Sequence, residues 1–262
     1  MKLFRSLVIV CLASLFAGAL PAAAGDAAAL YQEHCAACHG ERRLGGIGPA
    51  LLPENLERLR QPEALRVIRE GRTATQMPAF GDKLSSAEAQ QLVELIYAPV
   101  VPAPFWGERE IRASHVVDRR AAALPARPAA ALDGVDPLNL FVVVETGDHH
   151  VSLLDGDKLE RLHRFPSRYA LHGGPKFSPD GRFVYFASRD GWISKFDLYH
   201  FVVVAEIRAG LNTRNAAVSG DGKWVMVGNY LPHSLVVLDA ADLSLVKIIR
   251  SEEHTSELQS QR

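Results

Sequence analysis

The residues best suited to chemistry are two thiols and an imidazole in one short run, Cys35-Ala36-Ala37-Cys38-His39. The pattern Cys-x-x-Cys-His is the attachment signature of a c-type heme. On one helical turn both sulfurs can reach the two vinyl groups of one porphyrin, and the imidazole that follows falls under the iron as an axial ligand. The run therefore predicts a heme bound covalently by Cys35 and Cys38, with His39 as an iron ligand.

Three other interpretations of this run are a chance match, half of a zinc site and a structural disulfide. A zinc site needs a second pair of ligands at comparable spacing. The only other cysteine of the 262-residue chain is Cys11, which lies in a segment that we expect to be removed. Covalent heme is thus the preferred interpretation.

The second axial ligand is sought among the three methionines of the chain. Met1 is lost with the leader, and Met226 lies in a strand pattern far downstream. Met77 stands on a loop, where Pro78 stiffens its approach. A lone methionine is usually core filler, and the competing ligand, His34, adjoins the attachment motif and is badly placed for the opposite face. We therefore predict Met77 as the distal ligand.

The first 24 residues have the composition of an export signal. Lys2 and Arg5 precede an apolar run from Leu7 to Leu20, and small residues follow up to Ala24. This order describes a secretory signal peptide cleaved after Ala24, and the run is short for a retained membrane anchor. A periplasmic location is expected.

Composition excludes some classes of partner. The formal net charge is −1, with 29 basic and 30 acidic residues and no basic run, which argues against nucleic acid. No later segment is long and apolar enough for a bilayer. The length allows two domains.

The elements that must position the ligands form a small all-α domain, which we place at residues 25–98. A first helix is expected over 27–34, with Ala28 and Tyr31 on its inner side. A glycine-rich loop that ends in Gly48-Pro49-Ala50 follows the attachment motif. Helix and loop thus flank the heme-binding run.

Two further helices are predicted on either side of the Met77 loop. The first covers residues 62–71 and stops at Gly71. The second opens on a capping box, Ser85-Ser86-Ala87-Glu88. Its apolar stripe is formed by Leu92, Leu95 and Ile96.

Residues 99–138 are predicted to connect two domains, because they are rich in proline and alanine and make a poor core. Phe105, Trp106 and Ile111 indicate that part of this linker packs against a domain. Beyond it one pattern repeats, with apolar strands that begin at Phe141, Phe183 and Trp224, 42 and 41 residues apart. Each is followed by a turn and an alternating strand that ends in aspartate. That period is typical of four-stranded propeller blades.

Three blades cannot close a propeller, because they leave unpaired strand edges. Residues 139–250 are therefore expected to be the first blades of a longer domain, and the sequence to be an N-terminal piece of its protein. Residues 251–262 resemble the translation of a sequencing adapter and are set aside as an artefact.

On these motifs the chain resembles the cytochrome cd family, in which a c-heme domain precedes an eight-bladed propeller that holds heme d1. The helical domain resembles a class I-type cytochrome c through its attachment motif, its Gly-Pro-Ala-Leu loop at 48–51 and its Met-Pro loop. The propeller part resembles the family at residues 169–181, 183–191, 211–215 and 228–232. The resemblance implies an all-α cytochrome c domain followed by an incomplete all-β propeller, about three of eight blades. It also implies that a carbonyl of the proline loop holds the proximal imidazole.

Position by position, the resemblance implies roles in the propeller part. His172 falls where the proximal ligand of the d1 iron lies, and the glycines after it let a flat ring approach. The positions that contact the macrocycle and its acidic substituents are Lys176, Arg189, Arg214, Asn215 and Tyr230. Cationic and phenolic donors suit carboxylates. The alternatives are a satisfied loop histidine and ordinary surface arginines.

Two positions depart from the nitrite reductases of the family. Lys176 stands where they carry an arginine, and Thr146 stands near another of their arginines. A lysine lacks the flat bidentate fork of arginine, so the ring should be held less firmly. Looser binding suits an enzyme that releases its product.

The resemblance is sharpest to the members that oxidise dihydro-heme d1 during heme d1 maturation. It implies a periplasmic oxidoreductase that takes two electrons from a propionate of dihydro-heme d1 and passes them singly through covalent heme c. The implied partners are small electron-transfer proteins, nitrite reductase and heme d1 maturation proteins of denitrification. The alternatives are a nitrite reductase that makes nitric oxide, and a c-heme electron carrier whose propeller is a docking module. Acid and base residues are expected in later blades, so catalytic residues are not predicted.

Overall fold

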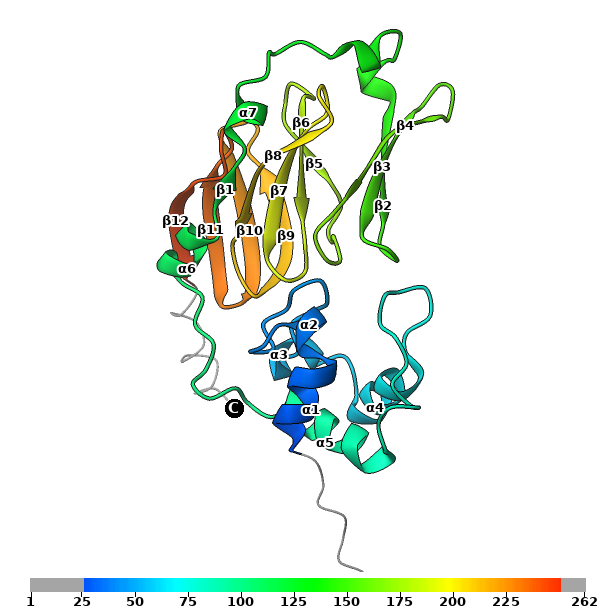
Figure 1. The fold of residues 1–262 in the computed structure, drawn as a ribbon. Helices are drawn as coiled ribbons and strands as arrows, with labels where there is room; N and C mark the ends of the chain where they lie inside the picture. Colours follow the sequence, from blue (N-terminus) through cyan, green and yellow to red (C-terminus); the bar gives the residue numbers. More distant parts are fainter. Residues whose placement is uncertain (1–25, 251–262) are drawn as a thin grey trace, which may run out of the picture.

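The computed structural model describes residues 26–250, which form a helical part followed by a stack of β-sheets (Figure 1). The order confirms the predicted all-α domain before an all-β one. The helical part lies beneath one end of the strands, and the cyan loop that follows α4 (Gln61–Glu70) reaches toward the first sheet. The predicted signal peptide and the predicted artefactual tail lie outside the described residues. No helix within residues 26–250 is long and apolar enough to cross a bilayer.

Five helices build the N-terminal part: α1 (Ala27–His34), α2 (Ala36–His39), α3 (Pro53–Leu56), α4 (Gln61–Glu70) and α5 (Ser86–Tyr97). The predicted capping box is present at the start of α5. The backbone N–H of Ser85 donates to Glu88 Oε2 at 2.8 Å, and the N–H of Glu88 donates to Ser85 Oγ at 3.2 Å. This box satisfies two N–H groups that a helix start leaves unpaired.

The core of the helical part lies between α1, α4 and α5. Tyr31 is 2% exposed and packs with Leu92 and Ile96, as the apolar spacing predicts. Ala28, predicted on the inner side, is exposed, which corrects that expectation. It lies in the first turn, where its N–H donates to the N-capping Asp26 at 3.0 Å.

Three antiparallel sheets form the blades. The first blade comprises β2 (Leu140–Glu145), β3 (His150–Asp155) and β4 (Arg161–Pro166). The second comprises β5 (Lys176–Phe177), β6 (Phe183–Ala187), β7 (Trp192–Asp197) and β8 (Val202–Arg208). The third comprises β9 (Asn212–Val218), β10 (Trp224–Leu231), β11 (His233–Asp239) and β12 (Leu245–Arg250).

The repeated turns of the sequence form equivalent hairpins in the second and third blades. Gly181 N–H donates to Ser178 O at 2.9 Å, and Gly222 N–H donates to Ser219 O at 2.9 Å. Both glycines have positive φ, which disfavours side chains. The repeat in sequence is therefore a repeat in structure.

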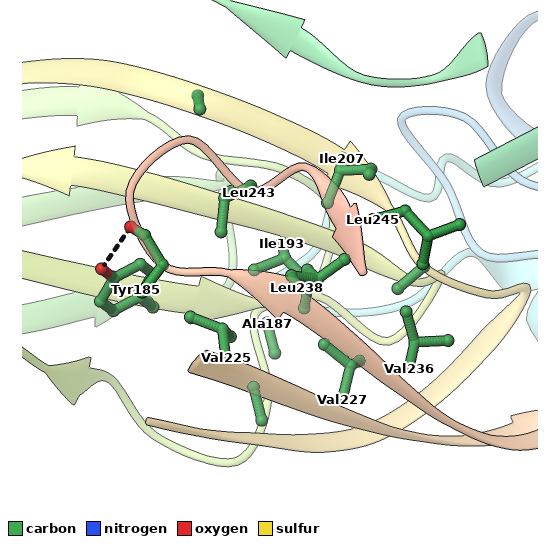
Figure 2. Close-up of a cluster of buried hydrophobic side chains, with 14 of the residues drawn as sticks. Tyr185, Ala187, Ile193, Ile207, Val225, Val227, Val236, Leu238, Leu243 and Leu245 are labelled. Atoms are coloured by element: carbon green, nitrogen blue, oxygen red, sulfur yellow. Dashed lines mark hydrogen bonds between the residues drawn. The ribbon is translucent and has the colours of Figure 1, made fainter. Parts of the chain in front are cut away.

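Buried apolar side chains hold neighbouring blades together. Figure 2 shows the cluster between the second and third blades, where Ile193 and Ile207 meet Val225 and Leu238. All four are fully buried. The hydroxyl of Tyr185 donates to the carbonyl of Ala240 at 3.0 Å, so this polar group at the edge of the cluster is hydrogen-bonded.

Part of the linker packs on the blades, as predicted. Its elements are α6 (Glu108–Ala113), β1 (Val116–Val117), α7 (Arg119–Ala122) and two short 3-10 turns. Ile111 is 1% exposed in the core between the blades, and Trp106 packs against the same core. Phe105 is 65% exposed. Strand β1 pairs with β8 and extends the second blade.

Candidate functional site

The predicted heme-binding thiols lie on one tight helical turn. Cys35 ends α1 and Cys38 lies in α2, and both are free, half-buried thiols. The N–H of His39 donates to Cys35 O at 2.9 Å, which continues the turn through the imidazole. Burial, followed by the neighbouring Cys38, raises the pKa of the Cys35 thiol to about 11. The motif thus has the local geometry that one porphyrin requires.

His39 is held by the loop that follows it. Its ring is 8% exposed, and its Nδ1 atom lies 2.8 Å from the carbonyl oxygen of Pro49. This contact confirms the expected proline-loop carbonyl. Because Nδ1 is engaged, Nε2 is the nitrogen that can bind iron. Burial lowers the pKa of the imidazole, which favours the neutral form that ligates a metal.

Glycines let this loop close against the motif. A Cβ at Gly48 would lie 2.9 Å from His39 Cε1, and a Cβ at Gly46 would lie 2.9 Å from the carbonyl oxygen of Cys38. Contacts this short do not occur between real side chains. The loop thus supports the imidazole from one side, as a cradle for a ligating histidine must, and the residues present fit a c-type heme.

A buried arginine that sequence reasoning missed ties the same loop to the helical core. Arg43 is 7% exposed and donates to the carbonyls of Leu95 and, at 2.9 Å, Ala98. The hydroxyl of Tyr31 donates to Gly40 O at 2.8 Å. These bonds fix the loop to α1 and α5. Nothing in the sequence around the heme motif indicates that Arg43 is buried.

Met77 lies on a loop whose two ends, near Gly71 and Phe80, lie close together. Gly71 has φ +75°, and a Cβ there would lie 2.9 Å from the carbonyl oxygen of Met77. The N–H of Phe80 donates to Ile68 O at 3.0 Å, which joins the end of the loop to helix α4. The Met77 side chain is half-buried against the helical core, to which Cys35 also packs. The loop therefore keeps Met77, the predicted distal ligand, against the same helical core as Cys35 of the attachment motif.

His34, the competing ligand, packs elsewhere. Its ring lies 6.0 Å from the ring of Phe80, centroid to centroid, and its Nε2 lies 3.7 Å from a carboxylate oxygen of Glu33.

The second predicted site lies where the second and third blades meet. The N–H of His172 donates to Ala187 O at 2.7 Å, and its Nδ1 lies 3.1 Å from the carbonyl oxygen of Arg214. Gly173 has φ +82°, and a Cβ there would lie 2.2 Å from Asn215 Oδ1. The fold therefore brings His172 together with Arg214 and Asn215, from separate repeats, and leaves Nε2 of His172 for a ligand.

Arg189 and Lys176, two other residues predicted to contact the macrocycle, make different contacts. The backbone of Arg189 bonds to Ala170 O at 3.1 Å and to the N–H of Thr213 at 2.9 Å, and its side chain is exposed. Lys176 Nζ instead donates to the carbonyls of Gly173, at 2.6 Å, and Gly174, at 3.1 Å. Lys176 thus braces the loop that carries His172.

Tyr230 and Thr146 are both exposed on the surface of the blades. Tyr230 is 46% exposed on β10, where it pairs with His233. Because Gly228 pairs with Asn215, Tyr230 lies at the end of the third blade that carries Asn215. Thr146 is exposed on the turn after β2.

A pocket of about 480 Å³ lies at the opposite end of the strands, beside the repeated hairpins. It includes Lys195, which is 4% exposed and donates to the carbonyls of Ala240, at 2.9 Å, and Ala241, at 2.8 Å. Burial lowers the pKa of Lys195 to about 8. Its hydrogen bonds explain this lysine as a link between blades, away from His172.

Two family models match separate parts of the chain. Residues 22–96 match the family described as cytochrome C oxidase, cbb3-type, subunit III. Residues 135–262 match the family described as cytochrome D1 heme domain. The division agrees with the helical part and the blades.

Individual relatives align with most of the chain, across both parts. The dihydro-heme d1 dehydrogenase of Pseudomonas aeruginosa is 61% identical over 237 residues, covering 90% of this chain and 47% of that protein. The nitrite reductase of Stutzerimonas stutzeri is 25% identical over 249 residues, covering 86% of this chain and 43% of that protein. A solved structure of the dihydro-heme d1 dehydrogenase NirN in complex with DHE aligns with a TM-score of 0.77 and 62% identity, covering 84% of this chain and 47% of that one. The chain spans about half the length of these relatives.

Proposed function

The chain joins a cytochrome c domain to part of a cytochrome D1 heme domain, and from this we propose that its whole protein oxidises dihydro-heme d1 to heme d1 and passes the electrons through covalent heme c. One observation carries the proposal over a nitrite reductase. Identity to the dihydro-heme d1 dehydrogenase is 61% over nearly the whole chain, and identity to the nitrite reductase is 25%.

The proposed reaction removes two hydrogen atoms from one propionate side chain of the substrate. The carbon–carbon single bond becomes double, which gives an acrylate and releases two electrons and two protons. A c-type heme, when bound, supplies one-electron chemistry. Each turnover therefore needs two successive transfers and an external one-electron acceptor.

In this proposal, the residues of this chain bind and orient heme c and the substrate. In the cytochrome c domain, Cys35 and Cys38 would hold heme c, with His39 Nε2 and Met77 on its iron. In the blades, His172 Nε2 would bind the substrate iron, while Lys176 keeps the loop of His172 in shape. The guanidinium groups of Arg189 and Arg214, both exposed, would pair with substrate carboxylates.

The location and the partners follow from the same proposal. The leader predicted for residues 1–24 supports export to the periplasm. We propose small periplasmic electron-transfer proteins as acceptors, and the nitrite reductase of denitrification, together with heme d1 maturation proteins, as partners that receive or supply the macrocycle.

Full-length protein with covalent heme c separates the three interpretations. With a soluble one-electron acceptor present and oxygen absent, we expect added dihydro-heme d1 to bind, to lose two hydrogen atoms by mass, and to pass its electrons through heme c to the acceptor. Stoichiometric retention of d1 with rapid nitrite turnover would establish a nitrite reductase. A protein that never binds d1 would be an electron carrier with a docking module.

A further inference from the structure

The cytochrome c domain contacts the blades through the loop that supports His39. A side-chain N–H of Arg208, at the end of β8, donates to the carbonyl of Leu44. Leu44 lies between His39 and Pro49, and its neighbour Gly45 donates its N–H to His39 O at 2.9 Å. The contact therefore reaches the segment that holds the predicted iron ligand.

Arg208 is rigidly held before it reaches this loop. It is 8% exposed, and its Nε donates to Asp190 O at 2.8 Å. Its guanidinium lies 4.8 Å from the ring centroid of Trp106, whose indole N–H donates to Arg208 O at 2.9 Å. The backbone N–H of Arg208 donates to Ser114 Oγ at 2.9 Å. Its main chain and side chain are thus fixed by the linker and the second blade.

The charge of Arg208 is costly to bury, so its partners must compensate for lost water. Burial lowers its pKa, and the nearby Asp190 carboxylate acts in the opposite direction. Asp190 is 2% exposed and accepts from Ser188 Oγ. Asp190 also follows Arg189 directly, so one turn touches both the predicted d1 site and the arginine that contacts the cytochrome domain.

Apolar side chains seal the same interface. Leu52 of the cytochrome domain and Leu211 of the blades are both fully buried and belong to one cluster. Ala50, 1% exposed, joins them, with Leu44 and Trp106 packed at the edge. A dry surrounding strengthens the hydrogen bond that Arg208 makes.

The Met77 loop touches the blades as well. The amide of Gln76 donates to the carbonyl of Asp148 at 3.2 Å. A Cβ at Gly147 would lie 2.8 Å from the carbonyl oxygen of Ala74. The loop that carries Met77 therefore rests on the first blade, and the loop that supports His39 rests on the second.

We propose that Arg208 is a positioning residue, which locks the loop of residues 43–50 against the blades and so fixes the heme c site relative to His172. The part concerning electron transfer rests on the proposed function; the part concerning the loop does not. Transfer between two fixed sites is sensitive to small displacements, so a residue that touches neither heme can set its rate.

The test compares Arg208→Met with Arg182→Met in full-length protein carrying heme c. Arg182 is a matched control, because it is also an arginine of the second blade, its side chain only 11% exposed, paired with Asp197 and bonded to Leu124 O at 3.1 Å. Its contacts lie away from the cytochrome domain. We expect backbone amides of residues 40–52 to exchange hydrogen about tenfold faster in Arg208→Met and at the wild-type rate in Arg182→Met. Equal exchange of this segment in wild type and Arg208→Met would overturn the proposal.

A second variant covers the case in which Arg208→Met fails to fold. Trp106→Phe keeps a ring but removes the indole N–H that bonds Arg208 O. It should accelerate exchange of the same segment by a smaller factor, and no acceleration would count against the proposal.

A kinetic measurement separates this inference from the proposed function. In single turnovers, Arg208→Met should slow reduction of heme c by dihydro-heme d1 about tenfold and leave its reduction by a small diffusible reductant unchanged. Unchanged transfer from dihydro-heme d1 would refute the electron-transfer part. If the wild type shows no such transfer, the proposed function fails, and the exchange result alone decides the role of Arg208 in the loop.

Discussion

The Nδ1 atom of His172 lies 3.1 Å from the carbonyl oxygen of Arg214, a contact that joins the second blade to the third. It engages one nitrogen of the imidazole, as the contact between His39 Nδ1 and Pro49 O does in the cytochrome domain, so that Nε2 is the nitrogen that could bind iron. The two predicted iron-binding histidines are thus oriented by the same device, a backbone carbonyl.

Covalent attachment of heme depends on both thiols. A Cys35→Ala, Cys38→Ala double variant, expressed with c-type maturation, should lose all heme that survives denaturation, because no other thiol follows the predicted leader. Mass spectrometry of the denatured chain measures this. Heme retained by the double variant would show that the attachment site is elsewhere.

Met77→Leu tests the distal ligand while keeping the size of the side chain. We expect the near-infrared sulfur-to-iron band to disappear and the midpoint potential of heme c to fall, because a thioether raises the potential. Met226→Leu, in β10, is the control and should leave the band unchanged. A band that persists in Met77→Leu would mean that another residue ligates the iron.

Gly48→Ala tests the cradle of His39. The added Cβ would meet His39 Cε1 at 2.9 Å, so the loop or the imidazole must move, at a cost of about 1–3 kcal/mol in the free energy of unfolding. Urea unfolding and the heme c spectrum measure the two effects. Gly220→Ala, which has nothing within 4 Å of its Cβ, should change neither. Identical behaviour of the two variants would exclude a close contact at Gly48.

Acid should weaken the first blade through Glu145. Hydrogen bonds from Arg164 and then Ser152 lower the pKa of this carboxyl group to about 2. Because the pKa is lower in the folded state, the stabilisation is complete above the ordinary pKa of about 4.5 and is lost as the pH falls toward 2. Glu145→Gln should remove this part of the acid sensitivity, measured as the urea midpoint against pH. Glu160→Gln, an exposed position of the same blade, should retain it; parallel curves for Glu145→Gln and wild type would contradict the assignment.

Local patterns predicted the fold well, because helices and blades are specified by nearby residues. The capping box at Ser85 and the aspartate-ended strands of the repeat are formed as expected. Contacts between distant residues were beyond the sequence. Arg208 and Leu44 are 164 positions apart, so nothing local marks Arg208 as an interface residue.

The candidate sites show the same limit. The motif around Cys35 and the resemblance at His172 named the ligands, but neither foresaw that Lys176 would bond the carbonyls of its own loop. The ammonium group of a lysine has three N–H donors and bonds to the backbone carbonyls within its reach. The path of the loop decides which carbonyls these are.

The central claim is that His172 binds the substrate from which heme c receives electrons. The most direct measurement mixes dihydro-heme d1 with oxidised full-length protein without oxygen and follows both chromophores. The protein is in about twofold molar excess, so that two heme c groups accept the two electrons. We predict that wild-type protein reduces heme c and forms heme d1, and that His172→Ala binds dihydro-heme d1 about tenfold to a hundredfold more weakly with an unchanged heme c spectrum. Equal binding and equal heme c reduction in wild type and His172→Ala would contradict the account.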